Sequence, residues 1–518
     1  MTDFAPHAPR GTDAPHPLLI AAAALAFVAL CALYWPFAAD DAFIVGRYAR
    51  NAAAGHGLVY NIGEQVSALT SPLHALIEAA LASLGLAPVE SYRLLAPLLV
   101  LAGWVAALRE TGIHGSAFVI FTAASLLSPF VALWTVGGLE TPLLCCLATL
   151  FAARLVVISG TDGARPRDLI WLGLLAGLMF LTRYDSVLVS APILLAVLTV
   201  EYRRPALWLG AALCLALAGG WLVFAAGYYG DIFPTSYYLK FAYAQRAGID
   251  SVSALLNFVL LSGLWLIALR LRPAPISEKP LLARAILRGA AFSLALFAVY
   301  ASRSSGQHMM FGYRLFVPYL MAASLVLALA LPEARRGLAA AVMAAQAGMI
   351  AVVGFVGINP APLTRIPGLH RAYAEYEFIT PATYGDFLQM LRDDAREITA
   401  HWQAQGREDQ PRIYLRTGGT GYWLPEFYVY ETLVSYRHDC AVPMAAMVDA
   451  AHYMQQLGFS QVGTVVEDRG RARDDVADDA ALLFATEMDW MGRYTTGYLY
   501  GPDPTPLDLG PTLASPCR

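Results

Sequence analysis

Long apolar runs separated by short polar connections fill the first two thirds of the chain. Residues 18–37 form a run long enough to cross a bilayer, which takes about 20 residues, and too long for the apolar core of a signal peptide. Ten further apolar stretches are centred near residues 99, 126, 150, 175, 193, 216, 261, 293, 322 and 348. The pattern predicts about eleven transmembrane helices in residues 18–357, with the first helix retained.

The pattern changes near residue 358. From there, shorter segments predict helices at 381–405 and 443–457 and strands at 412–415, 427–433 and 461–466. Of the 39 acidic and 35 basic residues in the chain, residues 358–518 contain 22 acids and 13 bases. The expected fold class is therefore mainly α. A cytoplasmic tail at 1–17 precedes a polytopic helical membrane body at 18–357, and a soluble α/β domain follows at 358–518.

Basic residues set the expected orientation, because the cytoplasmic connections of membrane proteins are enriched in lysine and arginine. Here they occupy every second connection: Arg109; Arg154, Arg165 and Arg167; Arg203 and Arg204; Arg270, Arg272, Lys279, Arg284 and Arg288; Arg335 and Arg336. The N-terminus is then cytoplasmic, and residues 358–518 lie outside. This assignment requires residues 71–87, interrupted by His74 and Glu78, to form an amphipathic helix in the membrane interface instead of a span.

Composition and motifs exclude several functions. Only 14% of the residues are charged, against about 25% in soluble proteins, and the acidic C-terminal domain argues against a nucleic-acid partner. The TGGTG segment at 417–421 lacks the lysine of a phosphate-binding loop and predicts a strand-to-helix turn. No spacing of cysteines or histidines indicates a metal site. Cys440 and Cys517 both lie in the C-terminal domain, where a disulfide and two free thiols remain open alternatives.

Ionisable residues at membrane depth gather in five connections on the expected outer side. They are Asp40, Asp41, Arg47, Arg50, Glu140, Arg183, Asp185, Asp231, Lys240, Arg303, His308 and Arg314. Ionisable groups at this depth are costly and indicate a functional site. Structural alternatives stay open: the carboxylates could cap helices, and Arg183 could form an ion pair with Asp185. Lys240 and Arg314 could simply extend toward the membrane interface.

Several of these residues stand in segments that resemble GT-C type membrane glycosyltransferases. Residues 40–85, beginning DDAFIVGRYARNAAAGHGLVYNIGE, are similar to the first outer loop of that family, which reads DDAYI-FRYARNL-EGHGLV-NPGE. The later segments GGLETPL, LTRYD, YYGDIFPTSYYLK and GYRLFVPYL follow in the order of the branch that includes the mycobacterial terminal arabinofuranosyltransferase. The chain departs from the family at Tyr184, where the family has proline, and at Gln307, where it often has an acid.

The resemblance implies a hexosyl- or pentosyltransferase that moves a sugar from a polyprenyl-phosphate donor to a hydroxyl. The acceptor would be a cell-envelope glycan, lipid or protein at the outer face of the bacterial cytoplasmic membrane. A carboxylate can act as the general base and cations can stabilise the leaving phosphate.

The roles expected for individual residues follow from this chemistry. Asp41 is expected to be the base and Asp40 its partner, and a divalent cation could bind near the pair. The expected donor-phosphate ligands are Lys240, Arg314 and Arg183. The residues expected to contact the sugar or the acceptor are Glu140, Asp231, Arg47, Tyr237 and His308.

Two other classes of membrane protein compete with the enzyme. A transporter or flippase of lipid-linked sugars would also hold buried charges, but transporters place them near the bilayer midplane in repeated halves. A structural or sensory protein would leave the convergent outer motifs unexplained. The clustering of the charges at one face, without an internal repeat, favours the transferase.

Overall fold

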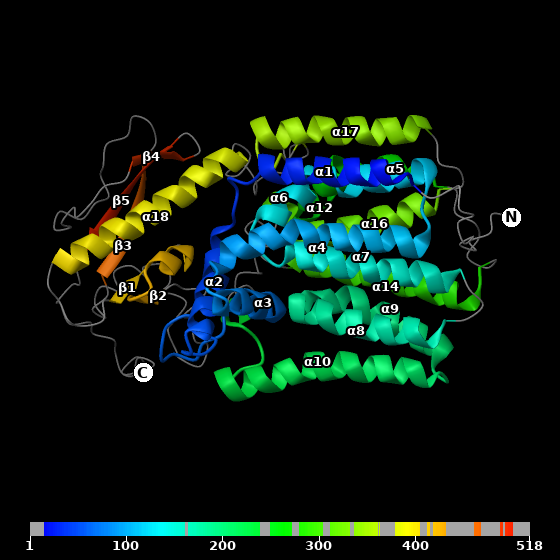
Figure 1. The fold of residues 1–518 in the computed structure, drawn as a ribbon, viewed down its shortest axis with the longest axis horizontal. Helices are drawn as coiled ribbons and strands as arrows, with labels where there is room; N and C mark the ends of the chain where they lie inside the picture. Colours follow the sequence, from blue (N-terminus) through cyan, green and yellow to red (C-terminus); the bar gives the residue numbers. More distant parts are fainter. Residues whose placement is uncertain are drawn as a thin grey trace.

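The computed structural model describes residues 15–160, 164–238, 249–271, 279–303, 311–331, 336–360, 362, 379–404, 412–414, 418–430, 460–467, 487–490 and 493–500. Figure 1 shows long helices packed side by side in a bundle, with α18 and the strands beyond one end of it. The helix α2 (Asp40–Ala53) lies across that same end, between the bundle and the C-terminal elements.

Thirteen of the described α-helices make up the bundle. They are α1 (Pro17–Leu33), α4 (Pro88–Thr111), α5 (Gly115–Ser125), α6 (Pro129–Val136), α7 (Thr141–Ser159), α8 (Pro166–Thr182), α9 (Val187–Glu201), α10 (Pro205–Tyr229), α12 (Ile249–Leu261), α13 (Leu264–Ala268), α14 (Leu281–Arg303), α16 (Val317–Leu329) and α17 (Arg336–Phe355). The short 3₁₀ helices are η1 (Tyr184–Ser186) and η4 (Phe311–Tyr313).

Each of the eleven expected apolar stretches contains helix. Six of the described helices are long and apolar enough to cross a membrane, or seven if α5 and α6, which are bent by 50°, form one span. The helices α1 and α16 are apolar but shorter. The expected mainly α, polytopic body is thus confirmed, while the count of eleven spans stays a prediction.

Proline and glycine explain where many of these helices begin and end. Proline occupies the first or second position of α1, α4, α6, α7, α8, α10 and α16, where its missing N–H group removes no helical hydrogen bond. At the other end, Gly112 follows α4 with a φ of 62° and Gly230 follows α10 with a φ of 78°. Because glycine adopts this left-handed conformation without strain, both helices can stop there.

The helix α3 (Pro72–Ser83) coincides with the segment that had to remain out of the membrane. It has 12 residues and does not qualify as a span. Its polar residues His74 and Glu78 are fully buried and lie 3.2 Å apart, His74 Nε2 to Glu78 Oε1. They therefore face the protein interior, and this inward position accounts for the two breaks in the apolar pattern.

The C-terminal elements form a mixed sheet with a helix. They are α18 (Pro381–Ala404), β1 (Arg412–Tyr414), η6 (Gly418–Trp423), β2 (Tyr428–Tyr430), β3 (Ser460–Glu467), β4 (Glu487–Trp490) and β5 (Arg493–Tyr500). The strand order is β2-β1-β3-β5-β4, parallel at β1 and antiparallel between β3, β5 and β4.

Comparison with the expected elements gives a mixed result. The helix at 381–405 and the three expected strands are confirmed, whereas the β4–β5 hairpin was not expected. The helix expected at 443–457 lies outside the described residues. The division of the chain at residue 358 stays a prediction.

The contact between α8 and α10 tests the packing of the bundle. A Cβ atom at Gly173 would lie 2.0 Å from Gly210 O, so the two backbones touch, whereas a Cβ atom at Gly219 would meet nothing within 4 Å. We expect Gly173→Ala to lower the free energy of unfolding by about 1–3 kcal/mol, because overpacking forces the helices apart. Gly219→Ala should be neutral or stabilising. Thermal unfolding in detergent compares the two, and equal melting temperatures would contradict this packing.

Candidate active site

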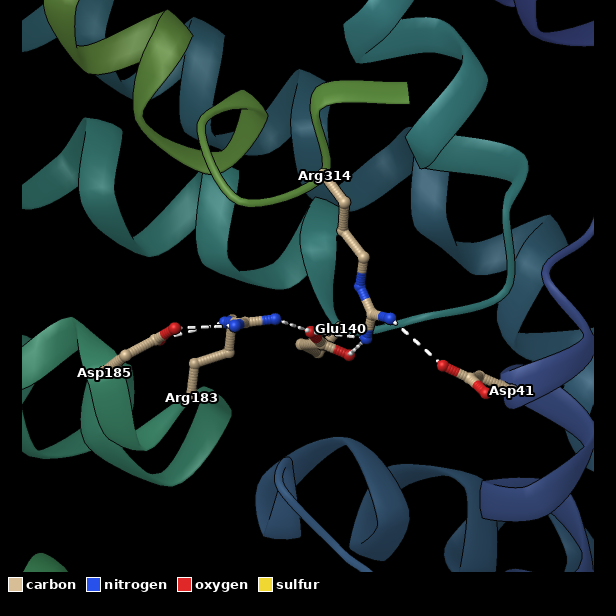
Figure 2. A network of polar contacts seen from close by, with 5 residues as sticks. All are labelled: Asp41, Glu140, Arg183, Asp185 and Arg314. Carbon is tan, nitrogen blue, oxygen red and sulfur yellow. Dashed lines mark hydrogen bonds and ion pairs between the residues drawn. The ribbon is translucent and has the colours of Figure 1, made fainter. Parts of the chain in front are cut away.

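Five charged side chains from four connections form a continuous row at the end of the bundle nearest α18 (Figure 2). Asp41 lies in the first turn of α2, and Glu140 immediately precedes α7. Arg183 and Asp185 lie between α8 and α9, and Arg314 follows η4. The structure thus brings together four of the connections in which the sequence placed ionisable groups.

Glu140 is the centre of this row. Its carboxylate is fully buried and accepts hydrogen bonds from Arg183 Nη1 at 2.7 Å and from Arg314 Nη2 at 3.2 Å. Burial alone would raise the pKa of Glu140, but the two guanidinium groups of Arg314 and Arg183 lower it below its usual value. Among the described contacts Glu140 makes no capping hydrogen bond to α7, so the capping alternative is not what its side chain does.

Arg183 is held by two carboxylates. Its Nε and Nη2 atoms donate to Asp185 Oδ1 at 2.9 Å and to Asp185 Oδ2 at 2.6 Å, while Nη1 donates to Glu140. The ion pair with Asp185, which the sequence left open as a structural alternative, is therefore present. Arg183 also lies deeper than Arg314, because its side chain is 10% exposed against 17%.

Arg314 joins the buried end of the row to its exposed end. Its Nη1 atom donates to Asp41 Oδ2 at 3.2 Å, and Nη2 donates to Glu140. The Asp41 side chain is 49% exposed, whereas that of Glu140 is 0% exposed. The Nε atom of Arg314 has no hydrogen-bond partner among the described residues. Arg314 therefore reaches into the carboxylates instead of extending away from the protein.

The backbone around Asp41 and Glu140 is fixed by contacts between their two loops. The N–H of Ala39 donates to Gly137 O at 2.9 Å, and Arg93 donates to Val136 O at 2.6 Å and to Phe37 O at 2.9 Å. These bonds fasten the loop before α2 to the loop before α7. The spacing between Asp41 and Glu140 is thereby set by backbone geometry.

Asp40, the neighbour of Asp41, has a different environment. Its Oδ1 atom accepts a hydrogen bond of 2.9 Å from the hydroxyl of Tyr384 in α18. Burial and the adjacent carboxylate of Asp41 raise the pKa of Asp40 to about 6.

Arg47 was expected to contact the sugar or the acceptor, but its guanidinium is fully used elsewhere. Its five N–H groups donate to five acceptors, which are Tyr60 O, Asn61 Oδ1, Gly421 O, Leu424 O and Phe427 O. Because no donor is left for a ligand, the structure assigns Arg47 to holding the C-terminal segment 421–427 against α2. The sequence could not reveal this role, since the acceptors in segment 421–427 are backbone carbonyls far away in the chain.

Asp231 and Tyr237 lie in the loop that follows α10. Asp231 Oδ1 accepts from Tyr238 Oη at 2.7 Å and from Phe233 N at 3.2 Å, and the Tyr237 ring stacks on Phe233 with centroids 4.5 Å apart. Thr235 N donates to Ser67 O at 2.7 Å, which ties this loop to the one that follows α2. Their roles toward a sugar stay predictions.

Several other expected residues cannot be placed. Lys240, His308, Cys440 and Cys517 lie outside the described residues. Within the described part of the chain, no group of three or more histidine, cysteine, aspartate or glutamate side chains could hold a metal ion. Among the described residues, no third carboxylate, histidine or cysteine therefore joins Asp40 and Asp41 in such a group.

Sequence reasoning missed Tyr384 altogether. The segment PATYGDF predicts only a helix start, and its contact with Asp40 joins residues 344 positions apart. No local pattern marks such a contact.

Comparisons with known proteins concern the fold and part of the sequence. The family described as dolichyl-phosphate-mannose-protein mannosyltransferase matches residues 70–224. The "Terminal beta-(1->2)-arabinofuranosyltransferase" of Mycobacterium tuberculosis is 30% identical over 231 residues, which are 40% of this chain and 35% of that protein. The match thus spans only about a third of that relative.

Solved structures of the same fold are those of ArnT from Cupriavidus metallidurans. The form bound to undecaprenyl phosphate and the apo form have TM-scores of 0.52 and 0.54 at 14% identity, and the likeness covers 91% of this chain and 97% of theirs. Together, the comparisons confirm the expected fold. The chain has the polytopic membrane fold of the GT-C glycosyltransferases.

The row predicts unequal effects of neutralising its buried centre, Glu140, and its exposed end, Asp41. Glu140→Gln leaves two buried guanidinium groups short of a counter-charge and should lower the free energy of unfolding by about 3–5 kcal/mol. Asp41→Asn changes a half-exposed ion pair and should cost less than about 1 kcal/mol. Thermal unfolding of the purified variants measures both. Similar losses for the two variants would show that Glu140 does not organise the row.

Proposed function

We propose that the protein is a membrane glycosyltransferase. It transfers a sugar from a polyprenyl-phosphate donor to a hydroxyl of a cell-envelope glycan, lipid or protein at the outer face of the bacterial cytoplasmic membrane. The observation that carries the proposal is the half-exposed Asp41, held by Arg314 at the open end of a row of otherwise buried charges. The GT-C fold supports it, as does the undecaprenyl phosphate named with one structure of that fold.

Asp41 suits the role of general base. Its side chain is accessible to a substrate, and a carboxylate within reach of the acceptor hydroxyl can take its proton. The acceptor oxygen then forms a bond to the anomeric carbon, and the bond from that carbon to the phosphate oxygen breaks. The phosphate leaves with the electron pair, and the proton stays on Asp41 until it is released.

Arg314 suits the role of stabilising the phosphate that leaves. Its guanidinium lies beside Asp41 at the exposed end of the row, and cations aimed at developing charge are strong contributors to catalysis. Glu140 holds Arg314 in place and, with its lowered pKa, remains anionic. Arg183 lies behind this contact and supports Glu140. Lys240, at the end of the YYGDIFPTSYYLK segment, is the second proposed phosphate ligand.

The distribution of charge along the bundle supports the proposed orientation. Arg154 donates to Glu110 and to Asp168 at 2.7 Å, near the ends of α4 and α7 that lie farthest from Asp41. Arg109, Arg165 and Arg167, which are among the expected cytoplasmic arginines, lie at the same end. A transporter of lipid-linked sugars would place its site near the bilayer midplane, so the position of the row at one end favours the transferase.

The decisive test of the base is Asp41→Asn. We expect the rate of sugar transfer from a polyprenyl-phosphate donor to fall about 10²–10⁴-fold, because the acceptor hydroxyl loses its proton acceptor. Bound polyprenyl phosphate should be retained. Asp393→Asn is the control, since Asp393 is an exposed carboxylate in an ion pair with Arg396. Undiminished transfer by Asp41→Asn would exclude Asp41 as the base, and lipid translocation without transfer by the wild type would favour the flippase.

The donor site is tested by native mass spectrometry of the gently purified protein. We expect wild-type protein to carry a polyprenyl phosphate, with or without a sugar, and Lys240→Ala combined with Arg314→Ala to lose it. The added mass would narrow the class of sugar. Well-folded protein that carries only bulk phospholipid in both forms would remove the support for these two residues as donor ligands.

A further inference from the structure

We propose that Tyr384 is a positioning residue of the transferase site, and that the site is complete only when the C-terminal region is docked on α2. This inference rests on the proposed function and adds a part to it that neither the sequence motifs nor the comparisons assign. It is carried by two independent sets of contacts, one made by α18 and one made by η6.

The first contact is the hydrogen bond from Tyr384 to Asp40. Tyr384 is 6% exposed, and its ring packs edge-on against that of Phe37 with centroids 5.0 Å apart. A Cβ atom at the next residue, Gly385, would lie 3.0 Å from Pro36 O. The first turn of α18 therefore lies directly on the loop that leads into α2. Because both partners are anchored, the Tyr384 hydroxyl approaches Asp40 from a fixed direction.

The start of α18 is itself held in place. Thr380 N donates to Thr383 Oγ1 at 2.8 Å and Thr383 N donates to Thr380 Oγ1 at 3.2 Å, a reciprocal cap of the helix N-terminus. Ile358 N donates to Ile379 O at 2.7 Å, which joins the start of α18 to the segment that follows α17. Tyr384 is thus positioned by the bundle as well as by its own helix.

The second contact places η6 against α2. A Cβ atom at Gly419 would lie 2.4 Å from the carbonyl oxygen of Asp40, so only glycine permits this approach. Arg47 holds the following carbonyls, and Arg50 donates to Tyr422 O at 2.9 Å. Phe43 packs on Trp423 with centroids 4.5 Å apart. The TGGTG segment, which carries no phosphate-binding chemistry, is explained by this close backbone contact.

The two consecutive carboxylates of Asp40 and Asp41 are held by different parts of the protein. Successive side chains on a helix point about 100° apart, so one partner cannot hold both Asp40 and Asp41. Arg314 holds Asp41 from the bundle, and Tyr384 holds Asp40 from the C-terminal region. If either carboxylate rotates, the geometry of the pair is lost.

The charge of Asp40 also depends on this contact. The described groups that act on it are Asp41 on the same helix, Tyr384 from α18 and the backbone N–H groups of Asp40 and Asp41. Burial and Asp41 raise its pKa to about 6, while the Tyr384 hydrogen bond favours the ionised form and lowers it. Without the hydroxyl, the pKa of Asp40 rises further, and a smaller fraction is ionised at any given pH.

The test is Tyr384→Phe, which removes the hydroxyl and keeps the ring. We expect kcat to fall on the order of tenfold, as for one lost hydrogen bond to a charged group, with the KM for the donor unchanged. The acid limb of the kcat profile should move to higher pH. Tyr428→Phe is the matched control, because the Tyr428 hydroxyl in β2 also donates to a carboxylate, but to Glu64 Oε1 at 3.0 Å and not to Asp40. It should leave both kcat and the profile unchanged.

A second readout does not depend on turnover. Protonation of Asp40 is followed by the infrared carboxyl band during a pH titration, with Asp40→Asn assigning the band. We expect the transition near pH 6 to move upward in Tyr384→Phe and to stay in Tyr428→Phe. An unmoved transition, or equal effects of the two variants on kcat, overturns the inference. If the transition moves in Tyr384→Phe but the wild-type protein shows no transferase activity, only the proposed function is contradicted.

Docking is tested separately with Gly419→Ala. The added methyl group meets the Asp40 carbonyl, so hydrogen exchange should increase in residues 418–430 and transfer should fall at least as far as in Tyr384→Phe. Gly348→Ala is the control, because a Cβ atom there meets nothing within 4 Å. Full transfer by a Gly419→Ala protein whose η6 exchanges freely would show that the docked C-terminal region is not needed.

Discussion

A carboxylate buried between two guanidinium groups is the constraint on which the rest of this structure depends. Glu140 has no contact with water, so its charge is tolerable only because Arg183 and Arg314 both reach it. The two arginines come from different connections, and Asp41 from a third. One glutamate therefore ties together helices that are distant in the sequence, and the bundle must close correctly at this end for its charge to be compensated.

The same arrangement produces a gradient from a rigid interior to an accessible edge. At the buried end, Arg183 donates two hydrogen bonds to Asp185. At the exposed end, Arg314 shares its donors between buried Glu140 and half-exposed Asp41. A side chain fixed at its inner end and open at its outer end is preorganised for an incoming anion. The hydrogen bonds made by Ala39, Gly137 and Arg93 also hold the backbone of these loops in place. Asp41 is therefore accessible while its position is constrained.

The sequence was informative wherever a structural feature requires a particular type of residue at a particular place in the chain. Charges at membrane depth are expensive, so Asp41, Glu140, Arg183 and Arg314 stood out, and the apolar runs located the helices. It was uninformative where the partners are remote in the chain. The backbone carbonyls that Arg47 binds have no sequence signature, and the hydrogen bond from Tyr384 to the Asp40 side chain joins residues 344 positions apart. The β4–β5 hairpin was missed because the four residues of β4, EMDW, include two acids and no β-branched residue, a composition that strands disfavour.

The bond between Tyr384 and Asp40 has a consequence for how the protein is made. Its two partners are 344 residues apart, so the ribosome has finished most of the polypeptide before the second one exists. During membrane insertion the first extramembrane loop emerges early and must wait, with Asp40 lacking this donor, until the last segments arrive. Formation of this contact is thus a late event of biogenesis, and a chain synthesised only as far as residue 383 lacks it.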